Sequence, residues 1–300
     1  MINKTLIAIF QQGSRTYFYS SLFFPPYLKK DVFGLYGFVR KADNFVDTIP
    51  QNKNGFYNFK NKYLRAIEGK LSGDIVVDNF VELMQRKNIK KEWVDAFFKS
   101  MEMDLKKSTY HNIDETLEYI YGSAEVIGLI MAQIMELPQK THSYAKKLGR
   151  AMQYINFIRD INEDLTLGRT YLPSEDLTKF DLPSLELKHT EQKPEAFKEF
   201  ILHQLNRYFT WQEEAEQGYK YIKKRYLIPV KTASEMYYWT AEQIHNNPFV
   251  VYQWKVKPLI LRIITTTISN LIDTSTKKYK TIPNHTSPIT AKNLITQKTD

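Results

Sequence analysis

The sequence predicts an all-α protein that folds as a single domain. Three observations support this: apolar residues recur at helical spacing along most of the 300 residues, strand patterns are sparse, and no Gly/Pro/Ser-rich linker divides the chain. A hydrophobic content of 43% is enough for a large core, although length alone allows one or two domains. We therefore expect a helical domain over residues 1–273 and a disordered basic tail over residues 274–300.

The apolar periodicity predicts nine helices in chain order, with boundaries uncertain by a few residues. The expected ranges are about 3–22, 31–46, 53–70, 74–87, 91–106, 114–136, 140–167, 193–225 and 229–246. Pro25-Pro26 and Pro138 should interrupt the helical pattern. Residues 165–193 are rich in turn-forming types, and we expect them to form a loop over the mouth of a cavity.

Two short acidic clusters stand far apart in the chain, and in each the outer aspartates are four residues apart. Residues at this spacing share one face of a helix, where two carboxylates repel each other unless a cation offsets them. Mg²⁺ prefers oxygen ligands and commonly bridges carboxylates to substrate phosphates. We therefore expect Mg²⁺, with Mn²⁺ as an alternative, to bind to Asp43, Asp47, Asp160, Glu163 and Asp164.

Each cluster also has an arginine beside it, Arg40 in the first and Arg159 in the second. A guanidinium group can bind a diphosphate through two parallel hydrogen bonds. Gln153 and Asn156 lie on the polar side of the second helix, and a stripe of this kind is costly to bury without a ligand. Either cluster alone could be an ordinary solvated face, but together they predict a helical enzyme that holds a diphosphate through Mg²⁺ between two facing helices.

With these residues in view, the chain resembles the squalene and phytoene synthases, which join two prenyl diphosphates head to head. The likeness covers about residues 14–255 and rests on four segments in the family's order: a serine-containing start at 14–17, a first aspartate-rich helix at 36–47, a cavity-lining segment at 119–128, and a second aspartate-rich helix with its exit at 153–173. The form of residues 122–128 is more like phytoene synthases. The resemblance implies an isoprenoid synthase-type bundle with a central cavity flanked by two aspartate-rich helices.

The resemblance also implies roles for individual residues. Diphosphate oxygens would be held by Ser14, Arg40, Arg159, Arg169 and Tyr237. Tyr119 and Tyr121 would face the carbocation, and Ala124 and Gly128 would leave room for the prenyl chain. The remaining substrate-binding positions would be Tyr17, Tyr36, Gln153 and Asn156.

The sequence departs from the family pattern at three places. Asn44 stands where many relatives have a carboxylate, and Glu125 replaces a small residue. A C-terminal arginine is absent from residues 250–254, so we expect Lys255 or Lys257 to make the C-terminal diphosphate contact.

The implied activity is prenyl transfer of the phytoene synthase type, in carotenoid biosynthesis. Two geranylgeranyl diphosphates would join through the cyclopropyl intermediate prephytoene diphosphate and lose a proton to give phytoene. No nicotinamide is expected, because no glycine-rich phosphate loop follows a strand. One alternative is a squalene or dehydrosqualene synthase acting on two farnesyl diphosphates. Another is a non-catalytic, membrane-associated assembly factor of the same fold.

The net charge of +9 and the apolar residues 258–272 bear on location and partners. The apolar segment is too short to span a bilayer, but it could lie on one, with Lys255, Lys257 and Arg262 near anionic headgroups. Alternatively, it packs against the helical body. We expect a cytoplasmic monomer at the periphery of a membrane. We expect no nucleic-acid partner, because no nucleic-acid-binding motif is present, and no disulfide, because the chain has no cysteine.

Overall fold

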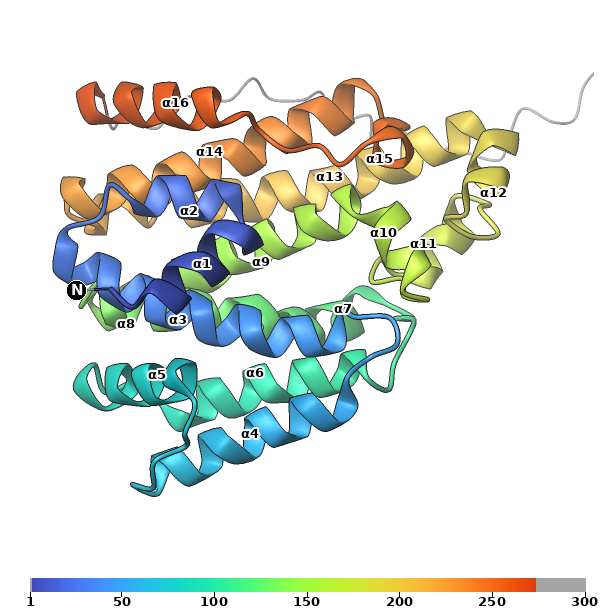
Figure 1. The fold of residues 1–300 in the computed structure, drawn as a ribbon. Helices are drawn as coiled ribbons and strands as arrows, with labels where there is room; N and C mark the ends of the chain where they lie inside the picture. Colours follow the sequence, from blue (N-terminus) through green and yellow to red (C-terminus); the bar gives the residue numbers. More distant parts are fainter. Residues whose placement is uncertain (1, 274–300) are drawn as a thin grey trace, which may run out of the picture.

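Two long helices carry the acidic clusters at the centre of the molecule. They are α3 (Pro26–Val46) and α9 (His142–Arg159), in a computed structural model that describes residues 2–273. In Figure 1, α9 runs diagonally above α3, and the two helices lie in the middle of the molecule. Helix α3 begins earlier than predicted because Pro26 occupies its first turn, where its fixed φ suits a helix and its missing N–H costs nothing.

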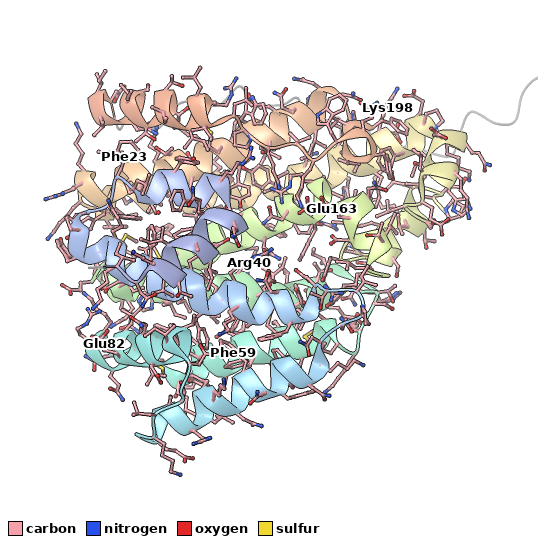
Figure 2. All side chains as sticks on the ribbon, viewed as in Figure 1. Phe23, Arg40, Phe59, Glu82, Glu163 and Lys198 are labelled. Atoms are coloured by element: carbon pink, nitrogen blue, oxygen red, sulfur yellow. The ribbon has the colours of Figure 1, made fainter. Side chains whose placement is uncertain are left out.

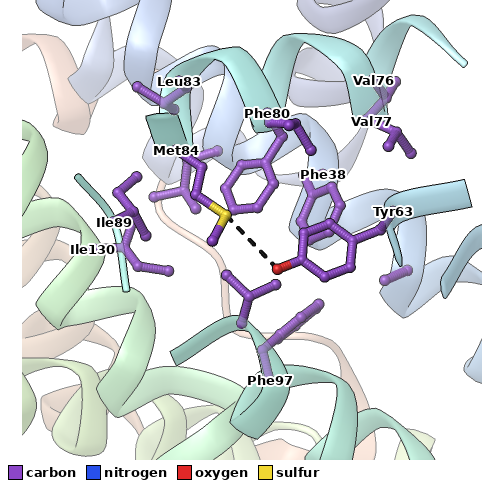
Figure 3. Close-up of a cluster of buried hydrophobic side chains, with 14 of the residues drawn as sticks. Phe38, Tyr63, Val76, Val77, Phe80, Leu83, Met84, Ile89, Phe97 and Ile130 are labelled. Carbon is purple, nitrogen blue, oxygen red and sulfur yellow. Dashed lines mark hydrogen bonds between the residues drawn. The ribbon is translucent and has the colours of Figure 1, made fainter. Parts of the chain in front are cut away.

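The N-terminal part of the chain supplies five further helices: α1 (Lys4–Gly13), α2 (Arg15–Ser21), α4 (Lys53–Ile67), α5 (Ile75–Arg86) and α6 (Lys91–Asp104). Helices α1, α4, α5 and α6 pack on α3, whereas α2 packs mainly on helices from the C-terminal part of the chain. The prediction of one helix over 3–22 was wrong, because Ser14 has an extended backbone and caps α2 with its hydroxyl. In the core between α3 and α5, Phe38 stacks on Phe80 at 3.9 Å, and the Tyr63 hydroxyl bonds Met84 Sδ at 3.7 Å (Figure 3).

The second half of the chain builds a separate apolar cluster around α9. Its helices are α7 (Ile113–Ile120), a π-helical turn η1 (Tyr121–Glu125), α13 (Pro194–Glu216) and α14 (Lys224–Asn246). Helix α8 (Val126–Ile134) follows η1, and its buried apolar residues belong to the first cluster, with α3 and α5. The range predicted as one helix over 114–136 is therefore interrupted by η1, which packs against α6 and α9. Helix α9 lies along α13 and also contacts α8 and α14.

Two further predicted boundaries differ from the structure. The range 140–167 divides into η2 (Gln139–Thr141), α9 and α10 (Ile161–Thr166), because the chain bends at Asp160. The helix predicted over 193–225 ends earlier, at Glu216, which is the last residue of α13. A short 3-10 turn, η3 (Tyr219–Tyr221), then precedes α14. Helix α14 starts before Pro229, which the early part of the helix accommodates.

The segment predicted as a loop over 165–193 contains two short helices. They are α11 (Ser174–Lys179) and α12 (Leu187–Gln192), and α12 packs on α13. The carboxylate of Asp176 fixes α11 to α13, where it pairs with Arg207 and accepts a hydrogen bond from Gln204 Nε2 at 3.1 Å. Within this segment only Leu167, Arg169 and Tyr171 line the central cavity. Most of the segment therefore lies away from the cavity, whose mouth it was expected to cover.

The C-terminal described residues form α15 (Val250–Gln253) and α16 (Ile260–Ile272). Helix α16 packs on α14 and α2, as the second alternative for residues 258–272 predicted. Among residues 2–273 we find no helix with the length and apolar character needed to cross a bilayer. The tail predicted over 274–300 lies outside the described residues.

The Asp176 cluster predicts how stability responds to acid. Burial opposes its charge, but His203 at 3.4 Å and the hydrogen bonds from Arg207 and Gln204 outweigh burial and hold the pKa of Asp176 below its usual range. A carboxyl with a depressed folded pKa stabilises the fold above its unfolded pKa of about 3.9, and this stability is lost as pH falls through the folded value.

We therefore expect Asp176→Asn to lower the free energy of unfolding at pH 7 by about 1–3 kcal/mol and to flatten the loss of stability below pH ~4. Denaturant titrations at several pH values measure both effects. As a control, Asp181→Asn changes an exposed carboxylate in the adjoining turn and should change little. Identical pH profiles for wild type and Asp176→Asn would contradict the assignment.

Candidate active site

A cavity of about 1090 Å³ lies between the two apolar clusters. Figure 2 places Arg40 of α3 and Glu163 of α10 near the middle of the molecule, where they belong to the polar end of this cavity. The predicted site residues that line it are Ser14, Tyr17, Tyr36, Arg40, Asp43, Asp47, Tyr119, Ala124, Gly128, Gln153, Asn156, Arg159, Asp160, Glu163, Asp164, Arg169 and Tyr237. Folding therefore brings both acidic clusters into one space.

On α3, each aspartate of the first cluster has an arginine partner. Arg40 Nη1 lies 2.5 Å from Asp43 Oδ2, and Arg169 Nη1 lies 2.9 Å from Asp47 Oδ1. Burial and the negative charge of Asp47 nevertheless raise the pKa of Asp43 to about 7, against the opposing effect of Arg40. Burial and Asp47 thus disfavour the charged form of Asp43, and an added cation would stabilise that form.

At the end of α9, the second cluster is also neutralised from within the protein. Arg159 donates to Asp160 through Nε at 2.8 Å and Nη2 at 2.6 Å. Burial alone would raise the pKa of Asp160, but Arg159 and Lys255 outweigh it and lower the pKa. Burial raises the pKa of Asp164 well above its usual value, and the charges of Asp160 and Asp47 add to this. The two clusters are therefore close enough to repel each other across the cavity.

The Lys255 ammonium lies between two predicted metal ligands. Its Nζ is 3.2 Å from Asp160 Oδ1 and also pairs with Glu163. Lys257 lines the cavity too, and burial together with the neighbouring Lys255 lowers its pKa. Both lysines thus stand at the polar end of the cavity, where the sequence predicts that one of them contacts diphosphate.

The donor set fits a hard divalent cation that is held partly by substrate. Carboxylate and amide oxygens are the ligands that Mg²⁺ prefers. Besides the five carboxylates, Asn156 Oδ1 is buried at the cavity without a hydrogen-bond partner. Across residues 2–273, no three acidic or histidine side chains converge on one point that could hold a metal. Since Mg²⁺ is usually bound by one or two carboxylates plus phosphate oxygens, this spacing suits a metal–diphosphate complex.

Asp104, which the sequence analysis missed, anchors two tyrosines beside the first cluster. The hydroxyls of Tyr119 and Tyr171 donate to its two carboxylate oxygens, each at 2.7 Å. Burial raises the pKa of Asp104 to about 6, although Arg169 and the two hydroxyls oppose the shift. A signal was present in the sequence, because Asp104 continues the apolar stripe of Phe97 and Met101 on α6 at helical spacing. A carboxylate on a buried face requires partners of this kind.

The Arg169 guanidinium is hydrogen-bonded to other groups of the protein. Its side chain is only 4% exposed, and it donates to Asp47, to the Tyr171 hydroxyl at 3.1 Å and to the Val46 carbonyl at 2.5 Å. With its donors committed in this way, Arg169 positions Asp47. Arg169 also lines the cavity, and its contact with diphosphate oxygens stays a prediction.

Tyr121 does not face the cavity, so its predicted role toward a carbocation was wrong. It lies at the start of η1, two residues after Tyr119, on the opposite side of the chain. Its ring is exposed on the surface, with Lys146 Nζ 5.3 Å from the ring centroid. Tyr119 remains the aromatic ring of this segment that lines the cavity.

Two glycines at the cavity serve close approach between helices. A Cβ on Gly128 would stand 2.2 Å from the Ala145 carbonyl oxygen, so this glycine lets α8 meet α9, and it also lines the cavity as predicted. A Cβ on Gly13 would stand 2.3 Å from the Tyr36 hydroxyl, so Gly13 makes room for Tyr36. Tyr36 stacks on Phe10, and Tyr17 lies beside Tyr237 at the other wall.

Comparisons with known proteins agree on one family. The sequence model of the squalene/phytoene synthase family matches residues 10–262. The chain is 26% identical over 262 residues to the 15-cis-phytoene synthase of Synechocystis, covering 80% of this chain and 76% of that protein. It is 25% identical over 259 residues to the chloroplastic phytoene synthase of an Oncidium hybrid, covering 80% of this chain but only 60% of that protein.

Solved structures show the same fold at lower sequence identity. The squalene synthase HpnC of Alicyclobacillus acidocaldarius superposes with a TM-score of 0.73 at 19% identity, covering 81% of this chain and 93% of that one. A dehydrosqualene synthase in complex with a ligand superposes with a TM-score of 0.74 at 22% identity, covering 89% of this chain and 94% of that one. Both similarities support the all-α isoprenoid synthase fold.

The Asp104 anchor yields a stability prediction. In Asp104→Asn the amide nitrogen cannot accept a hydrogen bond, so one buried tyrosine hydroxyl loses its acceptor, and we expect the free energy of unfolding to fall by about 1–3 kcal/mol. Glu102→Gln on the same helix is the matched control, because it alters only a partly exposed ion pair with Lys60 and should cost less than about 1 kcal/mol. Denaturant unfolding measures both variants, and equal stability of the two would argue against an anchoring role.

Proposed function

This chain belongs to the squalene/phytoene synthase family, and we propose that it is a phytoene synthase that condenses two geranylgeranyl diphosphates. The family consists of head-to-head prenyl transferases that need a divalent metal. One observation carries the proposal: two acidic clusters with arginine and lysine partners meet at one end of a cavity whose other end is apolar. Such a cavity suits a molecule with a diphosphate head and a long hydrocarbon chain.

At the polar end, the protein would hold the diphosphate by an exchange of partners. Arg40, Arg159 and Lys255 are each paired with a carboxylate of the two clusters. If those carboxylates take up metal, the released guanidinium and ammonium groups can turn to phosphate oxygens. Bound Mg²⁺ would supply the positive charge that stabilises the departing diphosphate. Asp43, Asp47, Asp160, Glu163 and Asp164 would hold it, with Asn156 Oδ1 as a further oxygen donor.

Beyond the diphosphate, the cavity walls would protect a carbocation from water. The apolar lining includes Phe24, Val32, Leu35, Met131, Met135, Ile222 and Val230. Tyr119 presents a ring at the junction between the polar and apolar parts, and its hydroxyl is fixed by Asp104. An aromatic face stabilises a cation by about 0.5–2 kcal/mol. A rigid, water-excluding environment of this kind favours rearrangement and proton loss over capture by water.

The choice of a C20 substrate rests on sequence likeness. The curated relatives at 25–26% identity are named as phytoene synthases, and the segment 122–128 resembles that branch of the family. The structural likeness to squalene and dehydrosqualene synthases lies below 25% identity and supports the fold alone. A peripheral position at a membrane belongs to the proposal, because both the substrates and the C40 product are lipids.

Metal dependence is the first consequence to test. Asp43→Asn and Asp160→Asn each remove one charge from a different cluster, and we expect each to lower turnover by roughly 10²–10³-fold with an unchanged helical circular dichroism spectrum. Asp95→Asn, in an exposed ion pair with Lys91, is the matched control and should retain wild-type turnover. Undiminished turnover by wild-type protein in excess chelator would rule out the metal-held diphosphate.

Product analysis tests the substrate. Purified protein with Mg²⁺ and geranylgeranyl diphosphate should yield phytoene at the same rate with and without NADPH, as measured by chromatography with mass detection. Farnesyl diphosphate, offered separately, should be turned over far more slowly. Faster turnover of farnesyl diphosphate, or a product that becomes reduced only when NADPH is present, would instead assign the chain to the squalene or dehydrosqualene synthases.

A further inference from the structure

Helix α16 presents its apolar side to solvent and its more polar side to the protein. The exposed residues include Leu261 at 70%, Ile268 at 49% and Ile272 at 80%, whereas the buried residues are one isoleucine, Ile263, and the polar Thr267 and Asn270. An ordinary surface helix has the reverse arrangement, with its apolar stripe against the core. We call the set Leu261, Ile264, Ile268, Leu271 and Ile272 the outer face of α16.

A buried hydrogen-bond network fixes α16 in this orientation. Asn270 Oδ1 accepts from Lys231 Nζ at 2.7 Å, and Asn270 Nδ2 donates to Glu235 Oε2 at 2.6 Å. Lys231 also donates to Glu235 Oε1 at 2.7 Å, and all three residues are buried. If α16 rolled over to bury its isoleucines, Lys231 and Glu235 would lose their hydrogen bonds to Asn270 inside the protein, and bonds to charged groups are costly to break there.

The outer face continues onto a neighbouring turn. Helix α2 contacts α16, and the residues that follow it, Leu22 and Phe23, are exposed. Figure 2 shows Phe23 at the end of the molecule where α16 finishes and α14 begins (compare Figure 1). The apolar surface is therefore built from two separate stretches of the chain and is larger than one helix face.

Basic and aromatic residues border this surface. Helix α16 runs antiparallel to α14, since Asn270 meets Lys231 near the start of α14 while Arg262 stacks on Trp239 farther along. The C-terminal end of α16 thus points toward the start of α14, where Lys223, Lys224 and Arg225 are exposed.

Aromatic residues complete the border at both ends. Near the start of α14, the exposed Tyr27 bonds the Tyr226 hydroxyl at 2.5 Å, and at the far end of α16 the side chain of Trp254 is 63% exposed. An apolar face edged by lysine, arginine, tyrosine and tryptophan is typical of surfaces that lie in a membrane interface.

We propose that the outer face of α16, together with Leu22 and Phe23, docks flat on an anionic lipid bilayer. The structure revises which charges would meet the headgroups: Lys223, Lys224, Arg225 and Arg262 border the face, whereas Lys255 and Lys257, predicted for this role from the sequence, line the cavity. The bilayer would cover the apolar face, and the basic border would attract anionic headgroups.

The apolar end of the cavity lies next to this surface. Phe24, which lines the cavity, directly follows the exposed Phe23 in the chain. On α14, Pro229 and Val230 line the cavity and directly precede Lys231, which bonds Asn270 of α16. A prenyl chain in the cavity would therefore point its tail toward the docked lipid. This step rests on the proposed function, since it needs a lipid substrate, whereas the docking surface itself rests on the exposed residues alone.

Vesicle flotation of the full chain, without substrate or metal, tests the docking surface independently of any activity. The vesicles contain phosphatidylcholine with or without phosphatidylglycerol. We expect wild-type protein to float with the anionic vesicles and binding to weaken as salt rises. The double variant Ile264→Glu/Ile268→Glu should lose more than about tenfold in binding. These positions are exposed, so circular dichroism and the melting temperature should be unchanged.

Two comparisons make the test specific. Leu71→Glu changes an 85% exposed leucine between α4 and α5, on the opposite side of the bundle, and should bind as wild type does. Lys224→Ala/Arg225→Ala should reduce the preference for anionic vesicles. Wild-type flotation by the double isoleucine variant would overturn the proposal. It would also be overturned if the wild type failed to float and sedimented as a dimer that Ile264→Glu/Ile268→Glu dissociates, because a second copy would then be the partner.

Discussion

Five carboxylates line one cavity, and the repulsion among them is the constraint on which the rest of the site depends. The raised pKa values of Asp43 and Asp164 express that repulsion, together with the cost of burial. The protein offsets it with cations placed against individual carboxylates, among them Arg159 and Arg169. A metal–diphosphate complex would replace these internal pairs with stronger ones and release cationic groups to bind the phosphates.

The same constraint explains why the cavity lies between two apolar clusters. The first acidic cluster lies at the end of α3, which packs into one core. The second begins where α9 ends and continues into α10, and α9 packs into the other core. The two cores keep the carboxylates at a fixed separation across the cavity. Asp104 extends this arrangement, because it ties Tyr119 and Tyr171 to α6 and so joins the wall of the cavity to the first core.

Buried polar networks also decide the shape of the surface. The Lys231–Glu235–Asn270 network holds α16 with its isoleucines outward. Burying those isoleucines would gain hydrophobic free energy, yet it would break the buried hydrogen bonds that Lys231 and Glu235 make with Asn270. An exposed apolar face is in this way built into the fold, and the cavity's apolar end lies beside it.

The sequence by itself determined the helical class and both acidic clusters, because helical spacing alone places residues four apart on one face. It also indicated the polar stripe of α9, where Asn156 and Asp160 were expected together and both line the cavity. Only the tertiary structure decided which groups meet across helices. Local periodicity could not show that Tyr121 turns to solvent, that Asp104 receives two hydroxyls, or that Lys255 reaches the second cluster. It also could not orient α16, because the polar partners that fix this helix lie on α14, and the cost of a buried unpaired charge depends on contacts between segments distant in the chain.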